Sequence, residues 1–114
     1  MNQLQVTARL KIHAGKLNEF KALAILAPAS TKEKDKHTLH YDWFLNEDET
    51  ECMVREKYTD SNAVFEHLAN LGDLFGKFLD WADFSVEVYG DPSEELRKAI
   101  AGMNPVIYSF YQGL

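Results

Sequence analysis

Hydrophobic and polar residues alternate strictly over residues 4–12, "LQVTARLKI". The positions predicted to share one face are Leu4, Val6, Ala8, Leu10 and Ile12. Such an alternation is typical of a strand with one buried face. The same period returns in residues 83–90, "DFSVEVYG", where Phe84, Val86 and Val88 fall on one face. The two segments therefore predict two strands that contribute apolar side chains to a common core.

The spacing changes after residue 16 to the three- and four-residue intervals of an amphipathic helix. The apolar stripe consists of Leu17, Phe20, Leu23, Ala24 and Ala27. Pro28 follows, and we expect it to kink or end this helix, because proline lacks an N–H and clashes with the preceding turn. We interpret "STKEKDK", residues 30–36, as a charged frayed end or a surface loop.

Sequence patterns that begin and end helices also occur after residue 58. Residues 59–72 predict a helix that Asp60 caps, since its carboxylate can accept a free backbone N–H, and that Gly72 ends. Two further helices and a closing aromatic strand are expected over residues 73–81, 91–102 and 103–111. In the second of these helices we assign the cap to Asp91, with proline at the first helical position.

The stretch "HYDWFLNEDETECMVREKY", residues 40–58, predicts a pair of strands around a turn at "NEDE". Turn length fixes which residues share a face. An even turn places inward Leu39, Tyr41, Trp43, Leu45, Cys52, Val54, Glu56 and Tyr58. An odd turn would set Arg55 and Lys57 beside the tryptophan, which buries less apolar surface. We therefore predict the even register, with His40 and Asp42 opposite Arg55 and Lys57 as cross-strand charge pairs.

These elements predict an α+β fold in a single domain over residues 1–114. Its first six elements make a ferredoxin-like βαββαβ core, to which an extra helix and a C-terminal strand are added. The helices would cover one face of the sheet. The other face carries a mixture of polar and apolar side chains, and a second copy of the chain is the simplest partner for it.

Charge and composition indicate which partners and which cellular compartment to expect. The 114 residues are 46% hydrophobic and carry a formal net charge of -6, with lysine and arginine scattered along the chain. This argues against nucleic acid and anionic membranes as partners. A lone cysteine, Cys52, allows no internal disulfide. Because no signal pattern or membrane-spanning apolar run accompanies it, we expect a cytoplasmic protein.

Two residues stand out as candidate chemistry. Glu56 falls on the apolar face, where a carboxylate must find a partner or take a raised pKa. His67 is open to two interpretations: a helix-edge or core histidine, or an acid–base group in a pocket near Glu56. Such a pair could take a proton from a phenol or quinol. The chain is also rich in aromatic residues, which suit a core or the lining for a flat aromatic ligand.

Other reactive residues are interpreted structurally. His40 and Asp42, with His37 nearby, could supply part of a metal site, but no further ligand follows at diagnostic spacing. We therefore expect a polar sheet face and no metal. Cys52 is expected to be a buried thiol. No flavin or nicotinamide fingerprint is present in the sequence.

The chain resembles the antibiotic biosynthesis monooxygenase family, in particular its quinol monooxygenase type. The resemblance rests on "LQVTARLKIHAGK", "LHYDWFLNEDETECMVREKYTDSNAVFEHLANLG", "EVYGDPSEELRKAI" and "VIYSFYQGL". It implies a homodimeric α+β barrel in which two sheets pack through their uncovered faces. It also implies oxidation of a small phenol or quinol by molecular oxygen without metal or flavin.

The resemblance also implies a role for His67, and our reading of the sequence adds the other site residues. The histidine of "FEHL" matches a position where many members of the family carry histidine, so His67 would be the base or positioning group. Glu56 would support it or compete with it. The pocket lining would include Tyr41, Trp43, Tyr58 and Phe65.

Two other hypotheses stay open. The chain could be a non-catalytic dimer that binds a small aromatic ligand. It could also bind haem, since a related branch of the family degrades haem. That branch has an Asn on the first strand and a Trp at the position that matches His67. This sequence has neither, so haem degradation is not expected.

Overall fold

Five strands form one open sheet in the order β2-β3-β1-β4-β5. The computed structural model describes residues 2–114. The strands are β1 (Leu4–Ile12), β2 (Thr38–Leu45), β3 (Glu51–Tyr58), β4 (Ala82–Tyr89) and β5 (Val106–Tyr108). Strand β1 lies between β3 and β4 and is antiparallel to both, whereas the short β5 runs parallel to β4 at the sheet edge.

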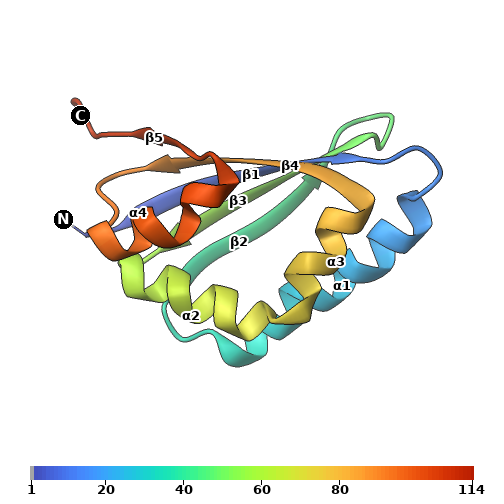
Figure 1. Ribbon diagram of the computed structural model, residues 1–114, viewed down its shortest axis with the longest axis horizontal. Coiled ribbons are helices and arrows are strands. Elements are labelled where there is room, and N and C mark those ends of the chain that lie inside the picture. The colour runs from blue at the N-terminus through green and yellow to red at the C-terminus, as the bar shows by residue number, and fades with distance from the viewer. Residues whose placement is uncertain (1) are drawn as a thin grey trace.

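The helices lie on one side of this sheet (Figure 1). They are α1 (Leu17–Lys34), α2 (Ser61–Leu71), α3 (Asp73–Trp81) and α4 (Glu94–Ile100), and a short 3₁₀ turn, Ala101–Met103, follows α4. The element order and the strand order confirm the predicted α+β fold, with a ferredoxin-like core, an extra helix and a C-terminal strand.

The β2–β3 hairpin has the predicted even register. Tyr41 pairs with Glu56 and Trp43 with Val54, and the backbone N–H of Asn46 donates to the carbonyl of Glu51 across the turn. The prediction for Leu39 was wrong. The strand pairing shifts between residues 38 and 40, so Leu39 lies in an irregularity of β2 and is 45% exposed.

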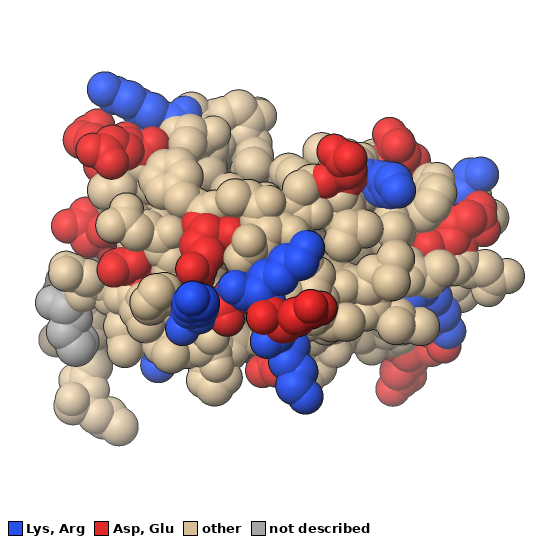
Figure 2. Space-filling view, turned by 90° about the horizontal axis from the view of Figure 1, so that it is seen from below, with Lys and Arg blue, Asp and Glu red and all other residues tan. Residues whose placement is uncertain are grey.

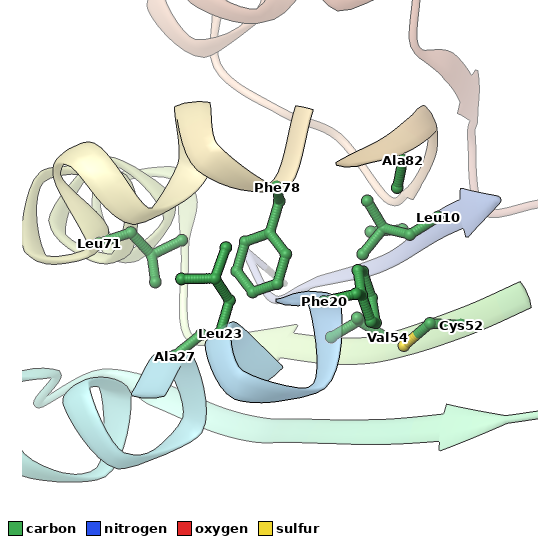
Figure 3. Packing of buried hydrophobic residues seen from close by; sticks show 10 residues of the cluster. Leu10, Phe20, Leu23, Ala27, Cys52, Val54, Leu71, Phe78 and Ala82 are labelled. Carbon is green, nitrogen blue, oxygen red and sulfur yellow. The ribbon is translucent and has the colours of Figure 1, made fainter. Parts of the chain in front are cut away.

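The core consists of two clusters between the helices and the sheet. In the first, Phe20 of α1 meets Phe78 of α3 with ring centroids 5.5 Å apart, and Leu23 packs beside them (Figure 3). Cys52 is buried in this cluster, and burial raises the pKa of its thiol to about 11, as expected for a structural thiol. The second cluster joins β1 and β4 to α4, where Leu96 is buried.

Helix α1 does not end at Pro28 but continues to Lys34. Our expectation that the following charged residues form a frayed end or loop is therefore wrong for residues 30–34. The physical reason is tertiary packing, because Ala27 and Thr31 on either side of the proline are both buried. This burial offsets the backbone hydrogen bond that Pro28 cannot make.

The caps of the later helices are only partly as predicted. Asp60 caps α2, accepting the backbone N–H of Ala63 at 2.9 Å, and Gly72 ends α2 at a φ of 53°. At α4, however, the cap is Ser93 and not Asp91, since the Ser93 hydroxyl accepts the N–H of Leu96 at 3.1 Å. The serine lies directly before the first helical residue, whereas Asp91 lies too early.

Acidic and basic side chains are interspersed on the face of the molecule seen in Figure 2. This agrees with the scattered lysines and arginines of the sequence. Within residues 2–114, no helix combines the length and the apolar character that crossing a membrane would require.

The position of Pro28 inside α1 leads to a stability prediction. Replacing Pro28 with Ala restores a helical N–H, so we expect the free energy of unfolding to rise by about 1–3 kcal/mol, a range that allows for the greater entropy of the unfolded variant. Urea denaturation measures this gain. Pro92→Ala, which changes a proline outside any helix, serves as the control and should give no comparable gain. A loss of stability in Pro28→Ala would contradict the interpretation.

Candidate active site

A cavity lies between the sheet and α2, α3 and α4. Its empty space is about 780 Å³ when the open solvent at its mouth is included, and about 80 Å³ of it can hold the centres of water-sized molecules. Its apolar lining consists of Val6, Ala8, Leu10, Val54, Val64, Leu68, Leu71, Phe75, Phe78, Phe84, Val86, Val88, Leu96, Ile100 and Met103. A mostly apolar, concave lining with a few polar groups is typical of small-molecule sites.

The remaining lining residues form what we call the polar corner: Tyr41, Trp43, Glu56, Tyr58 and His67. Four of them come from the predicted inner face of the β2–β3 hairpin, and His67 comes from α2. Their rings lie close together. The His67 ring centroid is 4.6 Å from that of Tyr41 and 5.6 Å from that of Tyr58. The hairpin register therefore brings the polar side chains to one side of an otherwise apolar space.

His67 is held in place by a carboxylate that the sequence did not single out. Its Nδ1 lies 2.8 Å from Oδ2 of Asp35, and the two side chains are only 4% and 1% exposed. Asp35 is the residue that ends α1. We had assigned it to a charged surface stretch, and this was wrong, because the α1–β2 connection turns the Asp35 side chain inward against α2.

Asp35 is surrounded by hydrogen-bond donors. Besides His67, Thr38 donates to it at 2.7 Å and Asn70 at 2.8 Å. Burial by itself raises the pKa of Asp35, but the hydrogen bonds from Asn70, Thr38 and His67 outweigh it and hold the pKa below its ordinary value. The group is therefore a carboxylate at neutral pH, and a carboxylate can only accept.

The protonation state and tautomer of His67 follow from its burial and its contact with Asp35. Burial lowers the pKa of His67, and the hydrogen bond and charge of Asp35 offset this only in part. The imidazole is therefore neutral at pH 7. Since Nδ1 carries the proton that it donates to Asp35, Nε2 has the free lone pair. A neutral histidine oriented in this way on a cavity wall can accept a proton from a ligand.

Glu56 makes its hydrogen bond with Tyr58 and not with His67, the residue that we expected to lie nearest to it. The hydroxyl of Tyr58 donates to Glu56 Oε1, and no hydrogen bond joins Glu56 to His67 among the described residues. Burial raises the pKa of Glu56 to about 7, although the Tyr58 hydrogen bond acts in the opposite direction. Glu56 is partly exposed, and it lines both the cavity and a second groove that His40 and Asp42 also line. Near neutral pH Glu56 can therefore exchange a proton with a ligand.

The other two polar groups offer hydrogen bonds to a ligand. Burial, and then the charge of Glu56, raises the pKa of Tyr41 far above its usual range, so its hydroxyl stays protonated. The indole nitrogen Nε1 of Trp43 is buried and makes no hydrogen bond of good geometry within the part of the chain that the structure describes, although its N–H acts weakly on the Tyr41 hydroxyl. An unpaired buried donor is costly, and a ligand oxygen in the cavity would satisfy it.

The predicted site residues are thus brought together with one exception. His67, Glu56, Tyr41, Trp43 and Tyr58 all line the cavity, whereas Phe65 does not and packs against the second core cluster. The residues His37, His40 and Asp42 lie outside the cavity lining. No group of three or more potential metal-ligating side chains is present within residues 2–114.

Comparisons with known proteins give a family and a fold. The sequence model of a family described as antibiotic biosynthesis monooxygenase matches residues 4–81. The structure of MupZ from Pseudomonas fluorescens superposes with a TM-score of 0.87 at 25% identity, covering 100% of this chain and 94% of MupZ. Rv0793 from Mycobacterium tuberculosis gives a TM-score of 0.71 at 20% identity, over 82% of this chain and 98% of Rv0793.

A mutant of SnoaB from Streptomyces nogalater, described as a cofactor-independent oxygenase, gives a TM-score of 0.68 at 14% identity. This match covers 82% of this chain and 96% of SnoaB. A search of curated protein sequences gives no significant match.

The raised pKa of Glu56 leads to a prediction about stability and pH. Because the folded-state pKa of about 7 lies above the ordinary glutamate pKa of 4.5, the contribution of Glu56 to stability is complete below pH 4.5 and is lost as the pH rises through 7. Replacing Glu56 with Gln removes this titration. The stability of the variant relative to the native chain should therefore rise by on the order of 2–3 kcal/mol between about pH 4.5 and 8.

Urea denaturation across this pH range measures the effect. The chain offers a matched control in Glu87, whose carboxylate accepts the hydroxyl of Tyr89 at 2.7 Å in an exposed copy of the same arrangement. Glu87→Gln reports the effect of the same substitution where the carboxylate is not buried against the cavity. Equal pH profiles for the two variants would contradict the assignment of a raised pKa to Glu56.

Proposed function

Because the chain belongs to the antibiotic biosynthesis monooxygenase family, we propose that it binds a phenol or quinol in the cavity and oxidises it with molecular oxygen. The observation that carries this proposal is the pairing of His67 with Asp35 at 2.8 Å. It gives the cavity a neutral imidazole with a fixed tautomer, which is what deprotonation of a phenol needs.

The first step of the proposed reaction is a proton transfer. Nε2 of His67 takes the proton of the substrate hydroxyl, and the imidazolium that forms is stabilised by the Asp35 carboxylate. The charge then lies on the substrate oxygen. The unpaired N–H of Trp43 would donate to that oxygen, and a donor already in place at a developing anion favours its formation. This assigns the base, the supporting carboxylate and the anion-binding group to different residues.

In the second step the substrate supplies the electrons and oxygen accepts them. The phenolate gives one electron to oxygen, and the two radicals combine to form a carbon–oxygen bond at a ring carbon that bears hydrogen. The peroxide takes the proton back from His67. Loss of the ring hydrogen as a proton, with cleavage of the oxygen–oxygen bond, leaves a carbonyl and releases water. Phenol and oxygen thus give quinone and water, and the substrate supplies all the electrons.

Glu56 is proposed to transfer protons during this second step. With a pKa of about 7 and a position in the cavity lining, it can deliver the proton that the departing water needs, or receive the one that the ring loses. Tyr58 keeps it oriented through its hydroxyl. The roles of Glu56 and His67 are therefore complementary in the proposal, although the two side chains do not contact each other by a hydrogen bond.

A prediction tests the base directly. We expect His67→Ala to lower kcat for oxidation of hydroquinones and phenols by about 100- to 10,000-fold, since general base catalysis contributes this much. Oxygen uptake measures it. Asp35→Asn should lower the rate by about tenfold or more. It should also move the acid limb of the pH–rate profile to lower pH, because Asp35 raises the pKa of His67.

The matched control is His37→Ala. His37 lies on the surface, where Nδ1 is 3.5 Å from Glu66 of α2, and its loss should leave the rate unchanged. If a broad panel of phenols and quinols shows no oxygen uptake while aromatic ligands bind tightly, the oxidation mechanism is excluded. A non-catalytic binding protein for aromatic ligands would then be the better description.

We also propose that the protein is a homodimer in which two sheets pack through the faces that the helices leave uncovered. Support comes from the outer face of the β2–β3 hairpin, where Phe44 is 56% exposed opposite Met53. A groove on this face is lined in part by Gln5, His40 and Asp42. An exposed aromatic residue amid polar groups is typical of an interface.

Phe44→Glu should therefore convert a dimer into a monomer, because it would bury a carboxylate against apolar surface. Sedimentation at micromolar concentration measures the change. The control is Ile25→Glu, which changes a residue of α1 that is 73% exposed and should leave the dimer intact. A native chain that sediments as a monomer would disprove the dimer.

A further inference from the structure

The cavity extends across the sheet, well beyond the polar corner. The strand registers place Tyr41, Glu56, Val6 and Val88 in one row, on β2, β3, β1 and β4 in turn, and all four line the cavity. Neighbouring strands lie about 4.8 Å apart, so the row spans about 14 Å. A single phenol ring covers only the part of this row nearest the polar corner.

The row changes character along its length. On β2 and β3 it carries a hydroxyl and a carboxyl, and on β1 and β4 it carries two valines. At the far end the lining comes from Leu96 and Ile100 of α4 and from Met103 of the following turn. The space next to His67 is therefore suited to an ionisable head, and the space beyond it is suited only to an apolar group.

The sheet carries a small side chain between the polar corner and the far end of the cavity. In the neighbouring row Ala8 of β1 lies between Val54 of β3 and Val86 of β4, and all three line the cavity. The methyl group of Ala8 is the smallest side chain in this part of the sheet. A larger residue there would stand in the cavity between the polar corner and the far end.

We propose that the substrate is an amphiphile: a phenol or quinol ring that carries a linear apolar chain. The ring, whose choice rests on the proposed function, lies at the polar corner, and the chain extends over β1 and β4 toward α4.

Binding of 4-alkylphenols from ethyl to octyl tests this proposal. Calorimetry without oxygen separates binding from oxidation. We expect the affinity to rise about fourfold with each added methylene until the cavity is filled. Ala8→Phe should keep the affinity for the ethyl compound and abolish the gain with chain length. Ala22→Phe, on the exposed side of α1, is the control and should behave as the native chain does.

A second variant covers the case in which Ala8→Phe does not fold, which circular dichroism would show. Met103→Trp fills the cavity from its far end, so the gain in affinity should stop at a shorter chain. An affinity independent of chain length in the native protein would overturn the proposal. So would an equal loss for all chain lengths in a folded Ala8→Phe protein.

The outcome separates this inference from the proposed function. Chain-dependent binding without oxygen uptake on any of the series would disprove the oxidation and support the amphiphile site. Oxidation of short phenols with no preference for longer chains would support the oxidation and disprove the amphiphile site.

Discussion

The buried carboxylate of Asp35 is the constraint on which the site depends. It joins the end of α1 to β2 through Thr38 and to α2 through His67 and Asn70. An ionised group that is buried is stable only when its hydrogen bonds are complete. The three donors must therefore all be in place together, which fixes α2 relative to α1 and to the edge of the sheet. His67 is oriented toward the cavity as a consequence of this fixed arrangement.

Glu56 shows what happens to a carboxylate on the same side of the sheet with fewer donors. It receives one hydrogen bond from Tyr58, and its pKa rises to about 7, while the pKa of Asp35 is lowered. The environments thus push two carboxyl groups in opposite directions. One is a permanent anion that orients a histidine, and the other can carry a proton near neutral pH. Because only one of them needs to be charged, the cavity can stay largely apolar and still contain acid–base groups.

The sequence allowed the hairpin register to be predicted because period-two alternation and burial agree on one turn length. That register also placed Tyr41, Trp43, Glu56 and Tyr58 on the inner face. Asp35 could not be predicted, since its burial depends on a connection between two elements and its neighbours in the sequence are charged. The end of α1 was mispredicted because we relied on the local effect of Pro28 on a helix. The burial of Ala27 and Thr31 keeps the helix intact past the proline. Phe65 was expected in the lining, but α2 turns it toward the second core cluster instead.

The far end of the cavity draws on later parts of the chain than the polar corner does, and this bears on how such a site can change. The residues of the polar corner, and Asp35 behind it, all lie within residues 4–81, which match the family. The far end is built from Val6 of β1 together with β4, α4 and the turn after it, and these pack in the second cluster with Tyr58 of the polar corner. Those later elements can change in sequence without touching the hydrogen bonds of Asp35. The side chains of the polar corner can therefore stay constant while the later elements change the shape of the far end of the cavity.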